Sequence, residues 1–532
     1  MARKLLALLI SVILLASAAG CSGGKENNTL SLNVGMEPRY MDPALNNAID
    51  GGMYIDQVFE GLTRFDKDGK VIPGMAEKWE ISADGTKYTF HLRKASWSDG
   101  KPVKAQEFEY AWKRALDPKT ASEYAYMLYV IKNGEAFNGG KAKAEDVGVK
   151  ALDDKTLEVM LEAPTAYFID ITNFTTMHPV RKDIIEKHGD QWTQKPETYI
   201  GNGPFVLEKW DHNSEITLKK NDNYYDKGKV KLSKIVFKLI EERAASLNAF
   251  ESGDIQYIYD HVPPEETQKL INDGKVKVFP DLSTYYYIFN TKKAPFDNVK
   301  VRKAFALAID RKAIVDKVTR AGEKAADNFV PPGVNGEASG KDFRSEADYK
   351  YLPEKADVEA ARKLLAEAGY ADGKGFPEIE LIYNTDERHK KIAEAVQEQL
   401  KQNLGVNIKI SNMEWKVLQQ KRQNKDFTLS RDGWVGDYND PMTFMDLWLS
   451  NSGNNNTQWS SAQYDDLIKK AKSTIDQKAR MKAMHDAERL LLEDVPILPI
   501  FYYVKPVALV PELKDVVLTV NGRLSLMHAY FE

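Results

Sequence analysis

The stretch "RDGWVGDYNDP", residues 431–441, brings a cation, an indole and an anion close together. Arg431, Trp434 and Asp437 lie within seven residues, with Gly433 and Gly436 between them. The run is too polar and too rich in glycine for a plain core strand, and too aromatic for an idle loop. We therefore take it as the first candidate for a functional site. The alternative for Asp437 is a capping role in the turn "DYND".

The sequence lacks the common catalytic motifs. It has no P-loop, no HExxH, no GxSxG and no dinucleotide fingerprint after a strand. Its eight histidines show no metal-ligand spacing, so we expect no metal and no cofactor. Acidic pairs such as Asp465 and Asp466 indicate the start of a solvated helix. With 78 acidic residues, a pair could still meet in a cleft, which leaves a secreted carboxylate-pair hydrolase open. The missing motifs favour a binding protein over an enzyme.

Length and composition set broad limits on the class of protein. A chain of 532 residues exceeds what one hydrophobic core supports, so two to four domains are expected. The 74 basic and 78 acidic residues leave a net charge of −4, which gives no electrostatic reason to expect nucleic acid as a partner. The 25 tyrosines and 9 tryptophans suit either a large binding surface or simply a large core.

The N-terminus has the pattern of an export signal. "MARKLLALLISVILLASAAGC" places two basic residues before an apolar run and small residues before Cys21. This order is typical of a signal peptide, and the run is short for a membrane span. The pattern resembles a bacterial lipoprotein signal, with Ala18 where the family more often has leucine. We expect residues 1–20 to be removed, Cys21 to carry lipid and residues 21–29 to form a flexible tether.

The remaining chain alternates short strands and helices, which predicts an α/β fold. "IELIYN", "HKKIAEAVQEQLKQNLG" and "VNIKIS" follow one another as strand, helix and strand, and this order indicates a sheet with a crossover helix. Residues 298–318 predict a helical region with Val301, Phe305, Ile309 and Ala313 on one face. The longest irregular stretch, residues 327–353, is predicted to be a surface connection.

Several segments in order carry a resemblance to a known family. They are "MDPALNN", the run from "QVFEGLTRF" to "KPVKAQEF", "GNGPFVLEKW", "VRKAFALAIDR", "ARKLLAEAGY" and "GWVGDYNDP". Together they resemble the bacterial oligopeptide-binding proteins of solute-binding protein family 5, the extracytoplasmic receptors of peptide ABC importers. The likeness covers nearly all of the mature chain.

The resemblance implies a periplasmic-binding-protein-like fold of two lobes, with a hinge and an extra inserted domain. Lobe I would comprise residues 30–60, 184–282 and 505–532. The inserted domain would be residues 61–183, and lobe II residues 283–504. The paired crossings near Leu282 and Val504 would form the hinge. The protein would act as a monomer, tethered to the cell membrane, and would deliver peptides to a membrane permease.

The resemblance also implies roles for individual residues in binding an extended peptide. Asp437 matches the aspartate that receives the peptide ammonium. Arg431, Arg422 and His389 match groups offered to the C-terminal carboxylate at different peptide lengths, and Gly433 would allow close backbone approach. Pocket walls match Trp434 and Trp415, and Tyr124 matches a tyrosine near the ligand. Asn47, Ala48 and Ile49 align with the segment that pairs with the peptide from the other lobe.

Other interpretations of single residues and of the ligand remain open. Trp415 could belong to a core, and Arg422 and His389 could be solvated surface charges. Some relatives have a cysteine pair where this chain has Ser283 and Val435. One relative has a glutamate at the position of Asn47, and its lysine near the site is replaced in this chain around Thr319 and Arg320. Within the same fold the ligand could be a murein tripeptide, or nickel, haem or a peptide pheromone.

Overall fold

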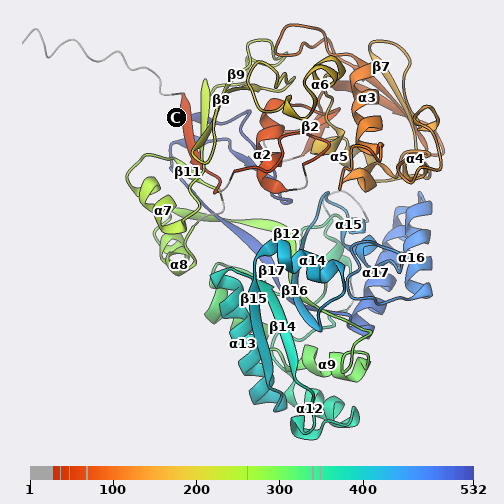
Figure 1. Ribbon diagram of the computed structural model, residues 1–532, viewed down its shortest axis with the longest axis vertical. Helices are drawn as coiled ribbons and strands as arrows, with labels where there is room; N and C mark the ends of the chain where they lie inside the picture. The colour runs from red at the N-terminus through yellow and green to blue at the C-terminus, as the bar shows by residue number, and fades with distance from the viewer. Residues whose placement is uncertain are drawn as a thin grey trace, which may run out of the picture.

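The computed structural model describes residues 28–532, except 36, 47, 67–69, 260–261, 338–340 and 348. The expected signal peptide, Cys21 and Asn47 lie outside the described residues. Two bodies stand one above the other in Figure 1, joined by two long strands. We call the upper body lobe I and the lower body lobe II.

One large mixed sheet runs through both lobes of the described chain. Its strands, in spatial order, are β15 (Ile408–Met413), β14 (Ile379–Asn384), β16 (Leu429–Val435), β12 (Val276–Phe289), β17 (Ile497–Leu509), β11 (Tyr257–Ile258), β1 (Thr29–Asn33), β10 (Lys234–Lys238), β9 (Glu215–Lys220) and β8 (Phe205–Asp211), with β13 (Lys324–Ala325) beside β17. Lobe I holds β1 and β8–β11, and lobe II holds β14–β16. β12 and β17 are therefore the strands that both lobes share.

β12 and β17 pair antiparallel from one lobe to the other, and their pairing is interrupted at the crossing. The register shifts between Pro280 and Thr284, opposite Val504 and Tyr502. Beyond this point β12 reads "STYYYIF", a run of β-branched and aromatic residues that is buried along its whole length. The shift leaves residues of β12 without a partner on β17, which is where a sheet bends most easily.

Lobe I carries an inserted unit with its own sheet. The strands are β4 (Ala76–Ile81), β5 (Lys87–Leu92), β7 (Thr156–Met160) and β6 (Val149–Ala151), in that spatial order. Helix α3 (Ala105–Leu116) packs on it through Phe108 and Trp112, both fully buried. A short hairpin of β2 (Thr63–Phe65) and β3 (Val71–Pro73) leads into the unit, and α2 (Ile49–Val58) precedes it.

The strand–helix–strand order predicted for lobe II is confirmed. β14 and β15 pair in parallel, and α13 (Glu387–Leu404) connects them. Asp386 caps the start of α13 with its side chain, and Gly405 ends it at a positive φ of 71°. Helices α9 (Val299–Ala308) and α12 (Val358–Glu367) pack nearby at the lower end of Figure 1.

Two local predictions need correction. The helical region predicted over residues 298–318 is present but divided, because α9 stops at Ala308, Ile309 is extended and Asp310 caps a second helix, α10 (Arg311–Ile314). Ala313 is consequently not fully buried with Val301, Phe305 and Ile309, and Arg311 and Ile314 are the buried residues of α10. The stretch 327–353 is not a surface connection, since Phe329 and Phe343 are fully buried in the larger core. Irregular backbone can enter a core when its polar groups find partners, as when Glu488 accepts the N–H of Val330 at 2.8 Å.

Among the described helices, none has the length and apolar character needed to cross a membrane.

Candidate functional site

The stretch singled out in the sequence forms β16 and the turn after it, and one edge of this strand is open. β12 pairs with all of β16, from Leu429 to Val435. On the other side, β14 pairs only with Leu429 and Ser430. From residue 431 to 435 no second strand of the described chain pairs with β16. The Gly433 N–H instead contacts the Asp432 side chain at 2.9 Å. An open edge of this kind can pair with an added peptide strand.

The Asp437 carboxylate lies where the inserted unit meets lobe II. It accepts hydrogen bonds from the hydroxyls of Tyr124 at 3.1 Å and Tyr126 at 2.9 Å. Both tyrosines belong to the segment around the short helix η1 (Ala125–Leu128). In the part of the chain that the structure describes, Asp437 has no ion pair with a lysine, arginine or histidine. In its ionised form the carboxylate is thus stabilised by two phenol hydroxyls but has no counter-ion among the described residues.

The backbone of Asp437 is held from two further segments. Its N–H donates to Thr443 Oγ1 at 3.1 Å, and its carbonyl accepts from Asn521 Nδ2 at 3.1 Å. Asn521 belongs to lobe I, so this contact joins the lobes next to the carboxylate. The turn that follows is capped by Asp440, whose side chain accepts the Met442 N–H at 2.9 Å. Asp440 therefore performs the capping that was the alternative role for Asp437.

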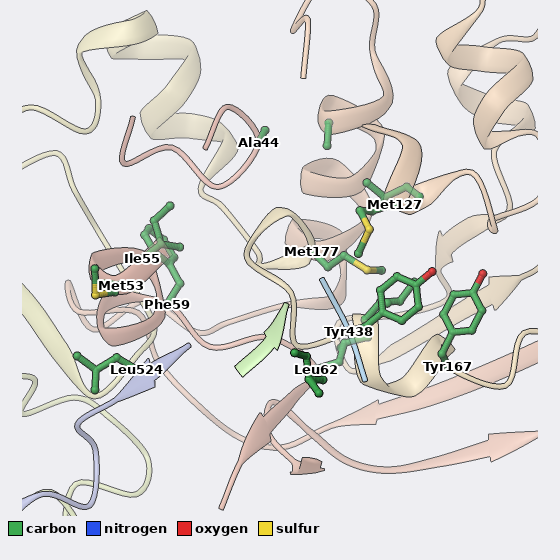
Figure 2. Packing of buried hydrophobic residues seen from close by; sticks show 14 of the residues in the cluster. Ala44, Met53, Ile55, Phe59, Leu62, Met127, Tyr167, Met177, Tyr438 and Leu524 are labelled. Carbon is green, nitrogen blue, oxygen red and sulfur yellow. The ribbon is translucent and has the colours of Figure 1, made fainter. Parts of the chain in front are cut away.

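A cavity of about 700 Å³ opens beside Asp437. Trp434 lines it, and so do Tyr167 and Tyr438, whose rings stack at 4.5 Å across the boundary between the inserted unit and lobe II. Figure 2 shows these two rings side by side. Burial raises the pKa of Asp437 to about 7, although the hydrogen bonds from Tyr126 and Tyr124 oppose the rise. The carboxylate would gain from a cation that enters the cavity.

Arg431 is a second charge without a counter-ion. Its Nη2 donates to the Tyr503 hydroxyl at 2.8 Å, and its guanidinium lies 5.0 Å from the centre of the Tyr285 ring. No carboxylate among the described residues pairs with it. A Cβ added to Gly433 would lie 3.3 Å from Arg431 Nη2 and 3.4 Å from the Tyr503 hydroxyl. Glycine at this position keeps room for the arginine and its partner.

Arg422 is placed differently from Arg431, because it already has a counter-ion. It forms an ion pair with Asp432 and is 8% exposed. Its guanidinium lies 5.2 Å from the ring centre of Trp415, the first residue of α14 (Trp415–Gln423). Trp415 itself is 44% exposed, so it is not a core residue. The open alternative of a solvated surface charge does not fit Arg422, and a ligand carboxylate would have to share it with Asp432.

His389 lies in the first turn of α13 and is buried beside Tyr285, with ring centres 5.6 Å apart. Burial, with a smaller effect from the nearby Arg431 and Arg388, holds the pKa of His389 far below its usual range. The ring is neutral at physiological pH and offers a hydrogen bond instead of a charge. The structure therefore brings His389 close to Arg431, as one cluster.

The segment expected from the opposite lobe is only partly described. Ala48 is the extended residue before α2, and Ile49 is its first residue, 41% exposed. Ile49 lies near Gly522, the residue after Asn521. Ala48 and Ile49 thus lie near the same lobe I turn that contacts the backbone of Asp437, while Asn47 is outside the described residues.

Three residues of the site were missed by sequence reasoning. Tyr126 stands two residues after Tyr124 in "TASEYAYM" and could have been found from that repeat of tyrosines. Tyr503 and Asn521 come from segments with no motif, and only the fold brings them to Arg431 and Asp437. Within the described chain, no group of three or more His, Cys, Asp or Glu side chains could hold a metal ion.

Comparison with known proteins identifies the class. Residues 70–456 match the model for bacterial extracellular solute-binding proteins, family 5 Middle. The chain is 40% identical to the oligopeptide-binding protein OppA of Bacillus subtilis, over 99% of this chain and 98% of the relative. It is also 37% identical to the periplasmic murein peptide-binding protein MppA of Escherichia coli, over 96% of this chain and 94% of the relative.

Solved structures agree with this assignment. The crystal structure of Haemophilus influenzae OppA in complex with RPPGFSPFR superimposes with a TM-score of 0.83, at 33% identity, and covers 95% of this chain and 99% of that one. The chain therefore belongs to the family 5 solute-binding proteins and has their two-lobed α/β fold. These are binding proteins and not enzymes. Ser283 and Val435, the two positions where some relatives have a cysteine pair, lie directly opposite each other on β12 and β16.

Proposed function

We propose that this protein is an extracytoplasmic receptor that binds oligopeptides in extended form between its lobes and delivers them to the permease of an ABC importer. The observation that carries the proposal is the un-neutralised Asp437 carboxylate beside a cavity, at the end of a strand with an open edge. These are the features that a zwitterionic, extended ligand requires.

The ammonium of a peptide would bind Asp437. A buried charge is tolerated when it is paired and hydrogen-bonded. Within the described residues the carboxylate accepts hydrogen bonds from the hydroxyls of Tyr124 and Tyr126 and has no ion pair. An incoming ammonium supplies the missing charge and can keep these hydrogen bonds. Because every free peptide carries an N-terminal ammonium, a receptor that recognises this group can accept peptides of many sequences.

The peptide backbone and carboxylate would bind along β16 and at its far end. The backbone would pair with the edge at residues 431–435, where Gly433 permits close approach. Arg431, which pairs with no carboxylate of the described residues, would receive the C-terminus of a short peptide. Arg422 and His389 would receive the C-terminal carboxylate of peptides of other lengths. Trp434 and Trp415 would form walls of side-chain pockets. The segment Asn47, Ala48 and Ile49 would pair with the peptide backbone from lobe I. Closure would bend β12 and β17 near Leu282 and Val504.

A murein peptide is the second candidate ligand. Within the described chain Arg431 forms no ion pair, and a ligand with an additional carboxylate could use it. The similarity to MppA, whose name records murein peptide binding, supports the same alternative. Among the described residues no group of three or more His, Cys, Asp or Glu side chains could hold nickel, and a peptide pheromone would use the same features as any other extended peptide.

The receptor would be anchored through lipid on Cys21. This rests on the signal pattern in the sequence, since Cys21 lies outside the described residues. Replacing Cys21 by serine should move the mature protein from the membrane to the soluble extracytoplasmic fraction, as measured by fractionation. Retention of a mature Cys21→Ser protein in the membrane would contradict the anchor.

Mass spectrometry of material released when the purified protein is denatured tests the ligand directly. We expect peptides of mixed sequence. A single murein fragment would support the second candidate. Release of no peptide, together with failure of synthetic tri- to pentapeptides to bind in calorimetry, would refute both.

A further inference from the structure

The cavity beside Asp437 is strongly acidic. Five carboxylates of the described chain line it: Glu123, Glu135, Glu162, Asp437 and Asp446. Of the two cations in its wall, Arg480 is already neutralised, because Asp440 accepts two hydrogen bonds from it, at 2.6 and 2.7 Å. Lys472 is the other. A space with this balance of charge attracts cations and repels anions.

The walls of the cavity are also aromatic. Tyr126, Tyr167, Trp434 and Tyr438 all line it. The faces of such rings attract ammonium and guanidinium groups, and tryptophan is the strongest of them. The Trp434 indole nitrogen has no hydrogen-bond partner within the described residues, so the ring is not held by a polar contact of its own. Acidic groups together with aromatic faces point to a cationic ligand, where acidic groups alone would not.

Asp446 is the acidic residue best placed to act together with Asp437. It lies close enough for its charge to help raise the pKa of Asp437, as a smaller effect beside burial. Its counter-ion is Lys472, with 3.7 Å between Lys472 Nζ and Asp446 Oδ2. Lys472 is 41% exposed, and a pair this long and this open is weak. A cation from a ligand could therefore replace Lys472 at Asp446.

We propose that this cavity receives the side chain of the first residue of a bound peptide, that it selects lysine or arginine there, and that Asp446 determines this selectivity. The inference rests on the proposed peptide-binding function, with the ammonium at Asp437. The side chain of the first residue is attached to the carbon that bears the ammonium. When the ammonium binds Asp437, which lines the cavity, this side chain can therefore enter the cavity. Its charge then meets Asp446 and the aromatic walls, while a glutamate there meets an excess of like charge, five carboxylates against Lys472 and the already paired Arg480.

The test compares three tetrapeptides, Lys, Ala or Glu followed by Ala-Ala-Ala, by calorimetric titration of the full mature chain. The wild type should bind the lysine peptide at least about tenfold more tightly than the glutamate peptide, a difference of about 1.4 kcal/mol. Asp446→Asn should reduce this ratio to about threefold or less. Lys472→Met removes the competing cation and should increase the ratio. These opposite shifts separate selectivity from damage to the fold, which would not raise the ratio in either variant.

Asp466→Asn is the control for the loss of one carboxylate, because Asp466 is exposed on α16 (Ala462–Ser473), the helix that carries Lys472, and does not line the cavity. It should keep the wild-type ratio. Equal affinity of the wild type for the three peptides would overturn the inference but leave the peptide receptor standing. A ratio that Asp446→Asn does not change would overturn the role of Asp446. If none of the three peptides binds, the proposed function and this inference both fall.

Discussion

Replacement of Asp437 by asparagine should weaken peptide binding by removing the charge that meets the ammonium. The change keeps the size of the side chain and an oxygen that can accept from Tyr124 or Tyr126. Loss of one partner strands the other in a desolvated site, at a cost of roughly 2–5 kcal/mol. This corresponds to roughly thirty-fold to a few thousand-fold in affinity.

Acetylation of the peptide N-terminus removes the same charge from the other side. The wild type should lose a similar factor for the acetylated peptide, and the two changes together should cost less than their sum, because the interaction is already absent. Calorimetric titration of the four combinations measures the coupling. Equal binding of free and acetylated peptides by the wild type would refute the reasoning and leave Asp437 as a structural acceptor for the two tyrosines.

Three further predictions follow from the same site. Because the pKa of Asp437 is raised to about 7 and an ammonium binds the ionised form, affinity should fall as pH decreases below 7, by up to about tenfold per unit. It should also fall above about pH 8 as the peptide amine deprotonates; Asp437→Asn should lose the acidic limb, and a pH-independent affinity of the wild type would contradict the assignment. Arg431→Ala should weaken the shortest peptides most, since Arg422 and His389 are expected to serve other lengths; an equal loss at all lengths in a titration series would indicate a structural arginine. Asn521→Ala removes the hydrogen bond from lobe I to the Asp437 carbonyl and should reduce affinity about two- to tenfold, the equivalent of one hydrogen bond; unchanged calorimetric affinity would show that the contact is incidental.

Local patterns in the sequence were sufficient for the strand–helix–strand unit of lobe II. The hydrophobic pattern predicts the strands β14 and β15 and the helix between them, which Asp386 caps and Gly405 ends. The parallel pairing of the two strands follows from the crossover helix. The break in the helical region at Ile309 and Asp310 was not predicted, because an aspartate cap can restart a helix inside a continuous apolar pattern. The burial of residues 327–353 was misjudged too, since irregular chain gives no periodic signal.

The candidate site divides in the same way. Asp437, Trp434, Gly433 and Arg431 lie on one short stretch, so their chemistry is visible in the sequence, and the resemblance to a family supplied their expected roles. Only the tertiary structure decided which charges have counter-ions. Arg422 and Arg431 look alike in sequence, yet Asp432 pairs with Arg422 while Arg431 meets a tyrosine hydroxyl.

The partners of Asp437 show why the sequence could not decide this. Tyr126 lies 311 residues away along the chain and Asn521 lies 84 away, and neither distance leaves a periodic or local signal. The sequence by itself determined the residue types, the strand–helix–strand unit of lobe II and the resemblance to the family. The electrostatic state of each charge depends on burial and on neighbours from distant segments, and these exist only once the inserted unit, lobe I and β16 have come together.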